Sequence, residues 1–167
     1  MNAQPYLASV AKLLNKNRLE AILIGNAAAA LQGAPVTTID FDFLIRNTRS
    51  NQRKLKQLTA DLEGTMFRPH YPASSLTRVM RDADGLQLDF CTVIDGVRSF
   101  EGLRSRATSE SFEGELLLVA SLEDIIKSKR AAGRPRDLAV LGVLEKTAQE
   151  KKTSYPGPAT GSSEEGQ

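Results

Sequence analysis

Apolar residues recur along this chain with two different periods, and the two periods predict alternating helices and strands. Near the N-terminus, Leu7, Val10 and Leu14 follow the spacing of one helix face. The unbroken apolar run at residues 21–24 is instead typical of a short buried strand, which Gly25 ends. In the first half of the chain, the pattern predicts a helix, a strand, a helix, a strand and a helix over residues 6–15, 20–24, 27–32, 39–45 and 50–62.

Turn and cap residues divide the second half of the chain. Asp84-Gly85 is a typical hairpin turn. Ser121 begins a capping-box-like helix start, Gly133 is a helix stop, and Asp137 is expected to cap the last helix. The predicted elements are two hairpin strands, a helical turn, a strand and two helices over residues 76–81, 86–93, 103–107, 115–119, 121–133 and 138–148. We therefore expect a mixed α/β chain of the α+β class.

The composition changes near the C-terminus. After residue 148 the chain is rich in Lys, Ser, Gly, Pro and Glu, and it has almost no apolar residue to bury. We therefore expect one folded domain over residues 1–148, with C-terminal helices within residues 121–148, and a disordered tail over residues 149–167.

Charge and residue counts exclude several classes of protein. The 22 Lys and Arg residues nearly balance the 20 Asp and Glu residues, which argues against a polybasic nucleic-acid coat. One Cys and one His exclude a disulfide framework, a multi-cysteine zinc site and a two-histidine metal motif. Cys91 is expected to be a small buried or half-buried filler, and His70 to be a loop residue.

The chain has no apolar run that approaches the ~18 residues of a membrane span. Its first residues also lack the basic and apolar segments of a signal peptide. We therefore expect a cytoplasmic protein with no membrane partner.

Two aspartates frame the second predicted strand. Asp40 and Asp42 lie two residues apart, so their side chains project from one face, while Phe41 and Phe43 take the other. Two like charges held this close raise each other's pKa unless a cation lies between them. Mg²⁺ is the natural cation, because it prefers carboxylate and phosphate oxygens.

Asp89 follows the same logic on a later strand, where Leu88 and Phe90 alternate with it. If this strand pairs beside the first, three carboxylates converge, which is enough for a two-metal phosphoryl-transfer site. Asp40, Asp42 and Asp89 are thus the expected catalytic and metal-binding residues. Mg²⁺ is the expected cofactor, with Mn²⁺ as a substitute.

Gly25 and Asn26 lie between a predicted strand and a predicted helix, where backbone N–H groups attract phosphate. The glycine lets a triphosphate approach, and the amide of Asn26 can donate a hydrogen bond. Together with Thr38, which precedes the first aspartates, they are expected to bind the nucleotide.

Lys129 and Arg134 complete the expected nucleotide site, because a transferred phosphoryl group needs cations that offset its charge. Other interpretations stay open for both. Lys129 is equally explained as a solvated helix lysine, and Arg134 as the ion-pair partner of Asp137 or Asp124 at the helix junction. The basic run around them can also steer RNA.

One ordered set joins these observations: Gly25-Asn26, Asp40-Phe41-Asp42 and Asp89. It resembles the signature of the DNA polymerase β-like nucleotidyltransferase superfamily. The later residues Lys129, Arg134 and Asp137 resemble a narrower branch of small bacterial proteins related to the toxin of the AbiE abortive-infection system. The resemblance implies a nucleotidyltransferase fold, with a mixed β-sheet, helices mainly on one face and a short C-terminal helical segment. It also implies Mg²⁺-dependent transfer of a nucleoside monophosphate from a nucleoside triphosphate to a hydroxyl acceptor, including RNA in a toxin–antitoxin pair.

Two departures from that pattern keep a second function open. Asn26 stands where the superfamily has Gly or Ser, and Val36 or Thr37 stands where the branch often has an arginine. The alternative is a catalytically weakened binding module or an antitoxin-like partner protein. A haloacid-dehalogenase phosphatase would need Thr where Leu44 stands, and glycosyltransferase domains that use Asp-x-Asp are usually longer.

The sequence identifies neither the nucleotide base nor the acceptor. Because few residues remain for a separate acceptor-binding domain, the acceptor site is expected to be shallow or to be completed by a second subunit. A partner protein or an oligomer is therefore also expected.

Overall fold

The computed structural model describes residues 4–68 and 75–154, so His70 and residues 155–167 of the expected tail lie outside the described residues. The helices are α1 (Gln4–Lys16), α2 (Gly25–Leu31), α3 (Arg49–Asp61), α4 (Phe100–Arg104), α5 (Leu122–Ala132) and α6 (Pro135–Ser154). The strands are β1 (Ala21–Ile24), β2 (Phe41–Ile45), β3 (Thr65–Phe67), β4 (Leu76–Arg81), β5 (Leu86–Cys91), β6 (Thr108–Phe112) and β7 (Glu115–Val119).

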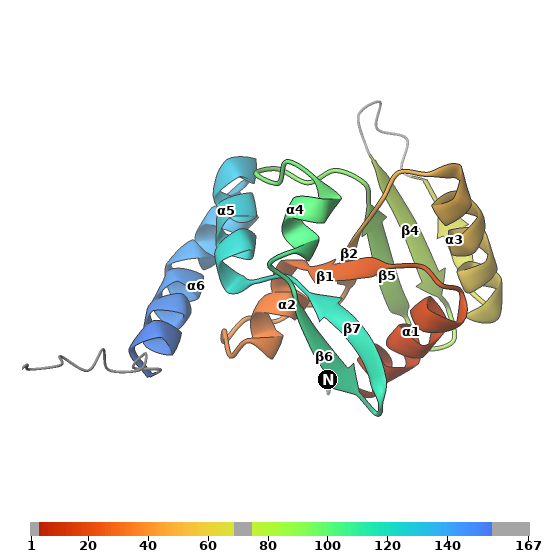
Figure 1. Cartoon of the computed structure of the whole chain (residues 1–167), viewed down its shortest axis with the longest axis horizontal. Helices are drawn as coiled ribbons and strands as arrows, with labels where there is room; N and C mark the ends of the chain where they lie inside the picture. The colour runs from red at the N-terminus through yellow and green to blue at the C-terminus, as the bar shows by residue number, and fades with distance from the viewer. Residues whose placement is uncertain (1–3, 69–74, 155–167) are drawn as a thin grey trace, which may run out of the picture.

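The strands form one mixed sheet in the order β3-β4-β5-β2-β1-β7-β6 (Figure 1). The central pairs β2–β5 and β1–β7 are parallel, and the other pairs are antiparallel. Every residue of β1 is buried, which explains its unbroken apolar run, because a strand covered on both faces needs no polar alternation. The expected mixed α+β fold is confirmed.

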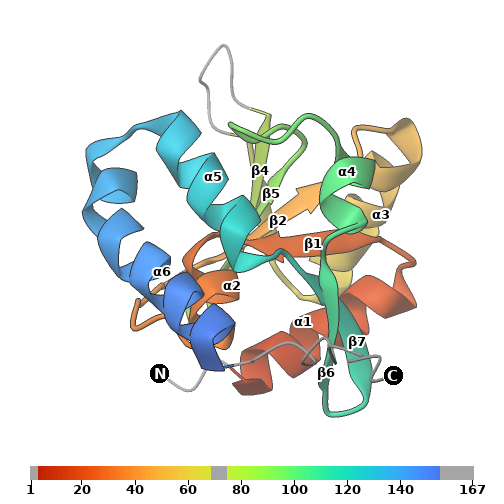
Figure 2. The same cartoon turned by 60° about the vertical axis from the view of Figure 1, so that its left-hand side comes forward.

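The helices form two groups (Figures 1 and 2). α1 contacts α3 and the β6–β7 hairpin, whereas α2 contacts β1, β2 and α5. α5 and α6 pack as a pair at one end of the molecule, away from α3. On the sheet, the rings of Phe43 and Phe90 stack with centroids 5.3 Å apart, and the alternation of each strand therefore leaves Asp42 and Asp89 on the opposite face.

The hydrophobic pattern did not predict two of the strands. β3 and β6 are the two edges of the sheet, and their side chains are mostly exposed. A strand with little to bury has no apolar period, so the pattern that predicts central strands does not reveal it.

The last helix differs from the expectation at both ends. It begins at Pro135, because proline suits the first turn of a helix, and it continues past residue 148 to Ser154. Residues 149–154 are therefore helical rather than disordered. Asp137 lies within the first turn and is not the cap. The short helix α4 likewise begins earlier than expected, because the Ser99 hydroxyl caps it by accepting from the Gly102 N–H.

In the part of the chain that the structure covers, none of the helices is long and apolar enough to cross a membrane.

Candidate active site

An open cleft of about 470 Å³ lies over the polar face of the sheet, between β4, α2 and the junction of α5 with α6. All eight residues that the sequence singled out line it: Gly25, Asn26, Thr38, Asp40, Asp42, Asp89, Lys129 and Arg134. Residues that lie more than 100 positions apart in the sequence therefore share one cavity.

Three carboxylates form the floor of the cleft. Asp42 and Asp89 are directly paired positions of the parallel strands β2 and β5, and Asp40 precedes β2 on the same side. One oxygen of each carboxylate lies within 4.8 Å of the other two. The condition that the sequence analysis attached to Asp89, that its strand lies beside the strand of Asp42, is met.

The electrostatics of this carboxylate trio (Asp40, Asp42 and Asp89) fit a bound cation. Burial, together with the charges of Asp40 and Asp89, raises the pKa of Asp42 to about 7, although Lys129 and Arg136 oppose the shift. A divalent cation would relieve this repulsion, and carboxylate oxygens are the ligands that Mg²⁺ and Mn²⁺ accept. The residues present therefore fit the expected metal.

Gly25 is required at its position for two independent reasons. Its φ of +69° lies in the left-handed region, and a Cβ placed there would meet Asp42 Oδ2 at 2.4 Å. The absence of a side chain lets the carboxylate of Asp42 sit directly against the start of α2.

The neighbouring side chains of Asn26 and Thr38 hydrogen-bond within the protein, apart from one oxygen of Asn26. The Asn26 amide donates to the Thr37 carbonyl at 3.2 Å, and its buried Oδ1 has no hydrogen-bond partner among residues 4–68 and 75–154. The Thr38 hydroxyl donates to the carbonyl and to the Oδ1 of Asp40, at 2.8 and 2.9 Å. Thr38 thus orients a carboxylate of the trio, and Asn26 fixes the start of α2 to the loop before β2.

Two cations of the cleft, Lys129 and Arg134, come from the α5–α6 junction. The buried carboxylate of Asp137 accepts from Lys129 Nζ at 3.2 Å and from Arg134 Nε at 2.5 Å. Burial raises the pKa of Asp137, but these two partners outweigh it and hold the pKa below its ordinary value. Arg134 thus forms the ion pair with Asp137 that one interpretation of the sequence predicted, and Lys129 pairs with the same carboxylate.

Sequence reasoning missed Arg78, a cation of β4 that touches the trio. Its Nε and Nη2 donate to Oδ1 and Oδ2 of Asp89 at 2.8 and 2.7 Å. The register of the hairpin contained the signal, because counting back from the turn at Asp84-Gly85 pairs Arg78 with Asp89. The Gln87 side chain lies beside this pair, where its amide oxygen is placed to accept from Nη2 and Nε of Arg78 at 3.0 and 3.1 Å.

Cys91 borders the same cleft and is half-buried. Burial, and then the charges of Asp42 and Asp89, raise the pKa of its thiol to about 12. The thiol is therefore protonated at neutral pH, and a protonated thiol is a poor nucleophile.

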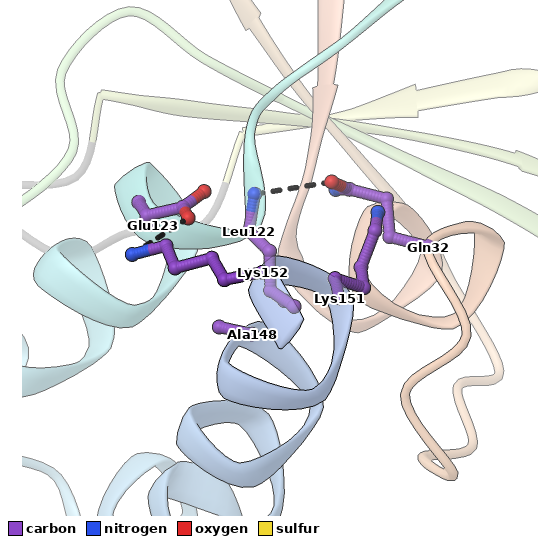
Figure 3. A pocket seen from close by; sticks show the side chains of 6 residues that line it. All are labelled: Gln32, Leu122, Glu123, Ala148, Lys151 and Lys152. Carbon is purple, nitrogen blue, oxygen red and sulfur yellow. Dashed lines mark hydrogen bonds and ion pairs between the residues drawn. The ribbon is translucent and has the colours of Figure 1, made fainter. Parts of the chain in front are cut away.

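A second hollow lies where the end of α6 crosses the start of α5 (Figure 3). Gln32 accepts there from the Leu122 N–H at 3.1 Å, and Lys152 pairs with Glu123 at 3.4 Å. These groups hold the helices together, so they give no indication of a ligand.

No family model and no curated protein sequence matches this chain. Solved structures do match its fold. ANT(2")-Ia in complex with adenylyl-2"-tobramycin is 11% identical and covers 92% of this chain and 94% of its own, with a TM-score of 0.61. The lincosamide antibiotic adenylyltransferase LnuA, lincomycin-bound, is also 11% identical and covers 88% and 98%, with a TM-score of 0.61. An antigenic nucleotidyltransferase-like protein from Paracoccidioides brasiliensis is 16% identical and covers 88% and 75%, with a TM-score of 0.54. The chain therefore has the nucleotidyltransferase fold that the sequence predicted.

Proposed function

We propose that this protein is a Mg²⁺-dependent nucleotidyltransferase, which moves a nucleoside monophosphate from a nucleoside triphosphate to a hydroxyl acceptor. One observation carries the proposal: the carboxylate trio converges within 4.8 Å beside a glycine that the approach of Asp42 requires. The nucleotidyltransferase fold supports it, because solved structures of this fold include a lincosamide antibiotic adenylyltransferase and a protein in complex with an adenylylated tobramycin.

In this proposal Asp40, Asp42 and Asp89 would hold two divalent cations. When bound, the cations neutralise phosphate charge and favour the ionised form of the acceptor hydroxyl. The acceptor oxygen bonds to the α-phosphorus, the bond from that phosphorus to the β-phosphate oxygen breaks, and pyrophosphate leaves. Asp89, which is buried on the sheet, would take the hydroxyl proton directly or through water.

The remaining cleft residues bind the triphosphate in this proposal. Lys129 and Arg134 supply positive charge on the helical wall, while Gly25 and Asn26 line the cleft at the start of α2 and Thr38 lines it before β2. Asp137 keeps the two cations in place. Its buried carboxylate touches both, so it acts on the nucleotide only through them.

Two classes of acceptor follow from different observations. The resemblance to the AbiE-related branch favours RNA, with a role as the toxin of a toxin–antitoxin pair. The solved structures with tobramycin and lincomycin favour a small hydroxyl compound.

Label transfer tests the function and separates the acceptors. The purified full chain is incubated with Mg²⁺ and each α-labelled nucleoside triphosphate, with total RNA in one series and a small-molecule extract in another. We expect label in one acceptor class with the wild type and with Asp61→Asn, a control on α3 far from the cleft, and none with Asp42→Asn. Equal transfer by Asp42→Asn would overturn the proposal.

A second candidate is a binding module that holds nucleotide without transfer, such as an antitoxin-like partner protein. The committed amide of Asn26 favours it, because that amide donates to Thr37 rather than to a phosphate. Metal-dependent nucleotide binding with no label transfer to either acceptor class would support this candidate over the enzyme.

A further inference from the structure

The ion pair between Arg78 and Asp89 places a protein cation inside the candidate metal site. The guanidinium grips both oxygens of the carboxylate, at 2.8 and 2.7 Å. Within residues 4–68 and 75–154, no other Lys or Arg forms an ion pair with Asp40, Asp42 or Asp89. Lys129 and Arg136 influence Asp42 only from a greater distance.

The two partners differ in their freedom to move. The Asp89 side chain is 6% exposed and belongs to a central strand, whereas the Arg78 side chain is 35% exposed on β4. A carboxylate held bidentately has both oxygens engaged, and a divalent cation brought beside it would also meet the positive charge of the guanidinium. Arg78 can turn toward solvent to relieve that repulsion, while Asp89 cannot leave the site.

We propose that Arg78 is the resident counter-ion of the site and competes with the divalent metal for Asp89. It neutralises one of three crowded carboxylates when no metal is bound, and it must release at least one oxygen of Asp89 when metal binds. Arg78 is therefore a positioning residue that acts through Asp89.

This inference rests on the proposed metal site, and direct metal binding tests both. Mn²⁺ is titrated into the full chain, without nucleotide, and bound Mn²⁺ is measured by calorimetry and by the loss of the free-ion electron paramagnetic resonance signal. Arg78→Gln removes the charge but keeps a hydrogen-bonding amide. Arg81→Gln is the matched control, because Arg81 lies on the same strand and grips Asp84 in the same bidentate way.

We expect Arg78→Gln to bind Mn²⁺ roughly tenfold more tightly than the wild type, because a nearby like charge is removed. Arg81→Gln should bind as the wild type does. Arg78→Lys keeps the charge without the bidentate contact, so its affinity for Mn²⁺ should lie between those of the wild type and Arg78→Gln. If circular dichroism shows that Arg78→Gln does not fold, Arg78→Lys replaces it in the test.

Two outcomes would overturn the inference, and they differ. If the wild type binds Mn²⁺ and the Arg78 variants bind it equally or more weakly, competition by Arg78 is wrong and the metal site stands. If neither the wild type nor the variants bind Mn²⁺ at millimolar concentration, the metal site itself is wrong.

Discussion

The two walls of the cleft hold their charged groups in opposite ways. On the sheet, the register of β2 and β5 forces like charges together, and burial together with these charges raises the pKa of Asp42 to about 7. On the helical wall, one buried acid, Asp137, is shared by two cations, and its pKa is lowered. The sheet wall is thus short of positive charge, while the helical wall carries two cations for one acid and keeps an excess of positive charge. A bound metal cation is therefore stabilised most at the sheet wall, whereas the cations of the helical wall are placed to contact the phosphates of a nucleotide.

The largest expected effect on transfer activity comes from a substitution in the carboxylate trio of the sheet wall. Asp42→Asn should lower transfer activity by a factor on the order of 100 to 1000. The variant would no longer hold the divalent cations whose positive charge stabilises the transferred phosphate. It should not lower the melting temperature of the metal-free protein, since burial disfavours the charge that is lost.

Thermal melting with and without Mg²⁺ checks this contrast. Mg²⁺ should raise the melting temperature of the wild type and not that of Asp42→Asn. A strong loss of stability in metal-free Asp42→Asn would show that the trio is not an electrostatic burden on the fold.

The next effect concerns the space beside Asp42. Gly25→Ala should destabilise the fold by about 1–3 kcal/mol and reduce metal binding, because its Cβ strikes the carboxylate and its φ is strained. Gly85→Ala is the matched control, because Gly85 also has a positive φ, +71°, but nothing lies within 4 Å of its Cβ. Urea unfolding should show a smaller loss for Gly85→Ala and unchanged metal binding. Equal effects of both variants would mean that backbone strain alone explains Gly25.

A smaller effect, which depends on pH, sharpens the contrast with the helical wall. A lowered pKa means that Asp137 contributes stability above its ordinary value of 3.8, and that the contribution is lost as pH falls through its folded pKa. Asp137→Asn should therefore cost about 2 kcal/mol at neutral pH. The difference from the wild type should close in strong acid.

Unfolding in urea across pH measures this difference. Glu123→Gln is a suitable control, because its partner Lys152 is 71% exposed and such pairs contribute little. A gap between wild type and Asp137→Asn that stays constant into acid would contradict the role of Asp137 as the shared acid.

The smallest expected effect is that of Cys91→Ala. The thiol lines the cleft but is protonated at neutral pH, so transfer activity should change by less than about twofold. Steady-state kinetics of the variant would check this, and a loss comparable to that of Asp42→Asn would assign the thiol a role in the reaction.

The sequence predicted the contents of the sheet wall better than its contacts. The i, i+2 spacing placed Asp40 and Asp42 on one face, and alternation placed Asp89 on a polar face, because strand geometry is local. The ion pair of Arg78 was missed, because it depends on the register between two strands. The edge strands β3 and β6 were missed, because their side chains bury little.

The helical wall was predicted less well, for a different reason. Asp137 resembles a helix cap in sequence, yet its carboxylate binds Lys129 and Arg134. This contact depends on how α5 and α6 pack together, which the local sequence does not reveal. The end of α6 was also misjudged, since polar residues near a C-terminus have the same composition whether they extend a helix or follow it.

The pairing of Asp42 with Asp89 links folding accuracy to the chemistry of the cleft. A slip of one residue between β2 and β5 would turn one of these carboxylates to the other face and bring a neighbouring phenylalanine or leucine in its place. A molecule with that slip could keep its sheet and still have no trio. The stacked Phe43 and Phe90 oppose such a slip, because only the native register brings the two rings together. An aromatic pair on the far face of the sheet thus helps to fix the strand register on which the carboxylate trio depends, without contacting the site.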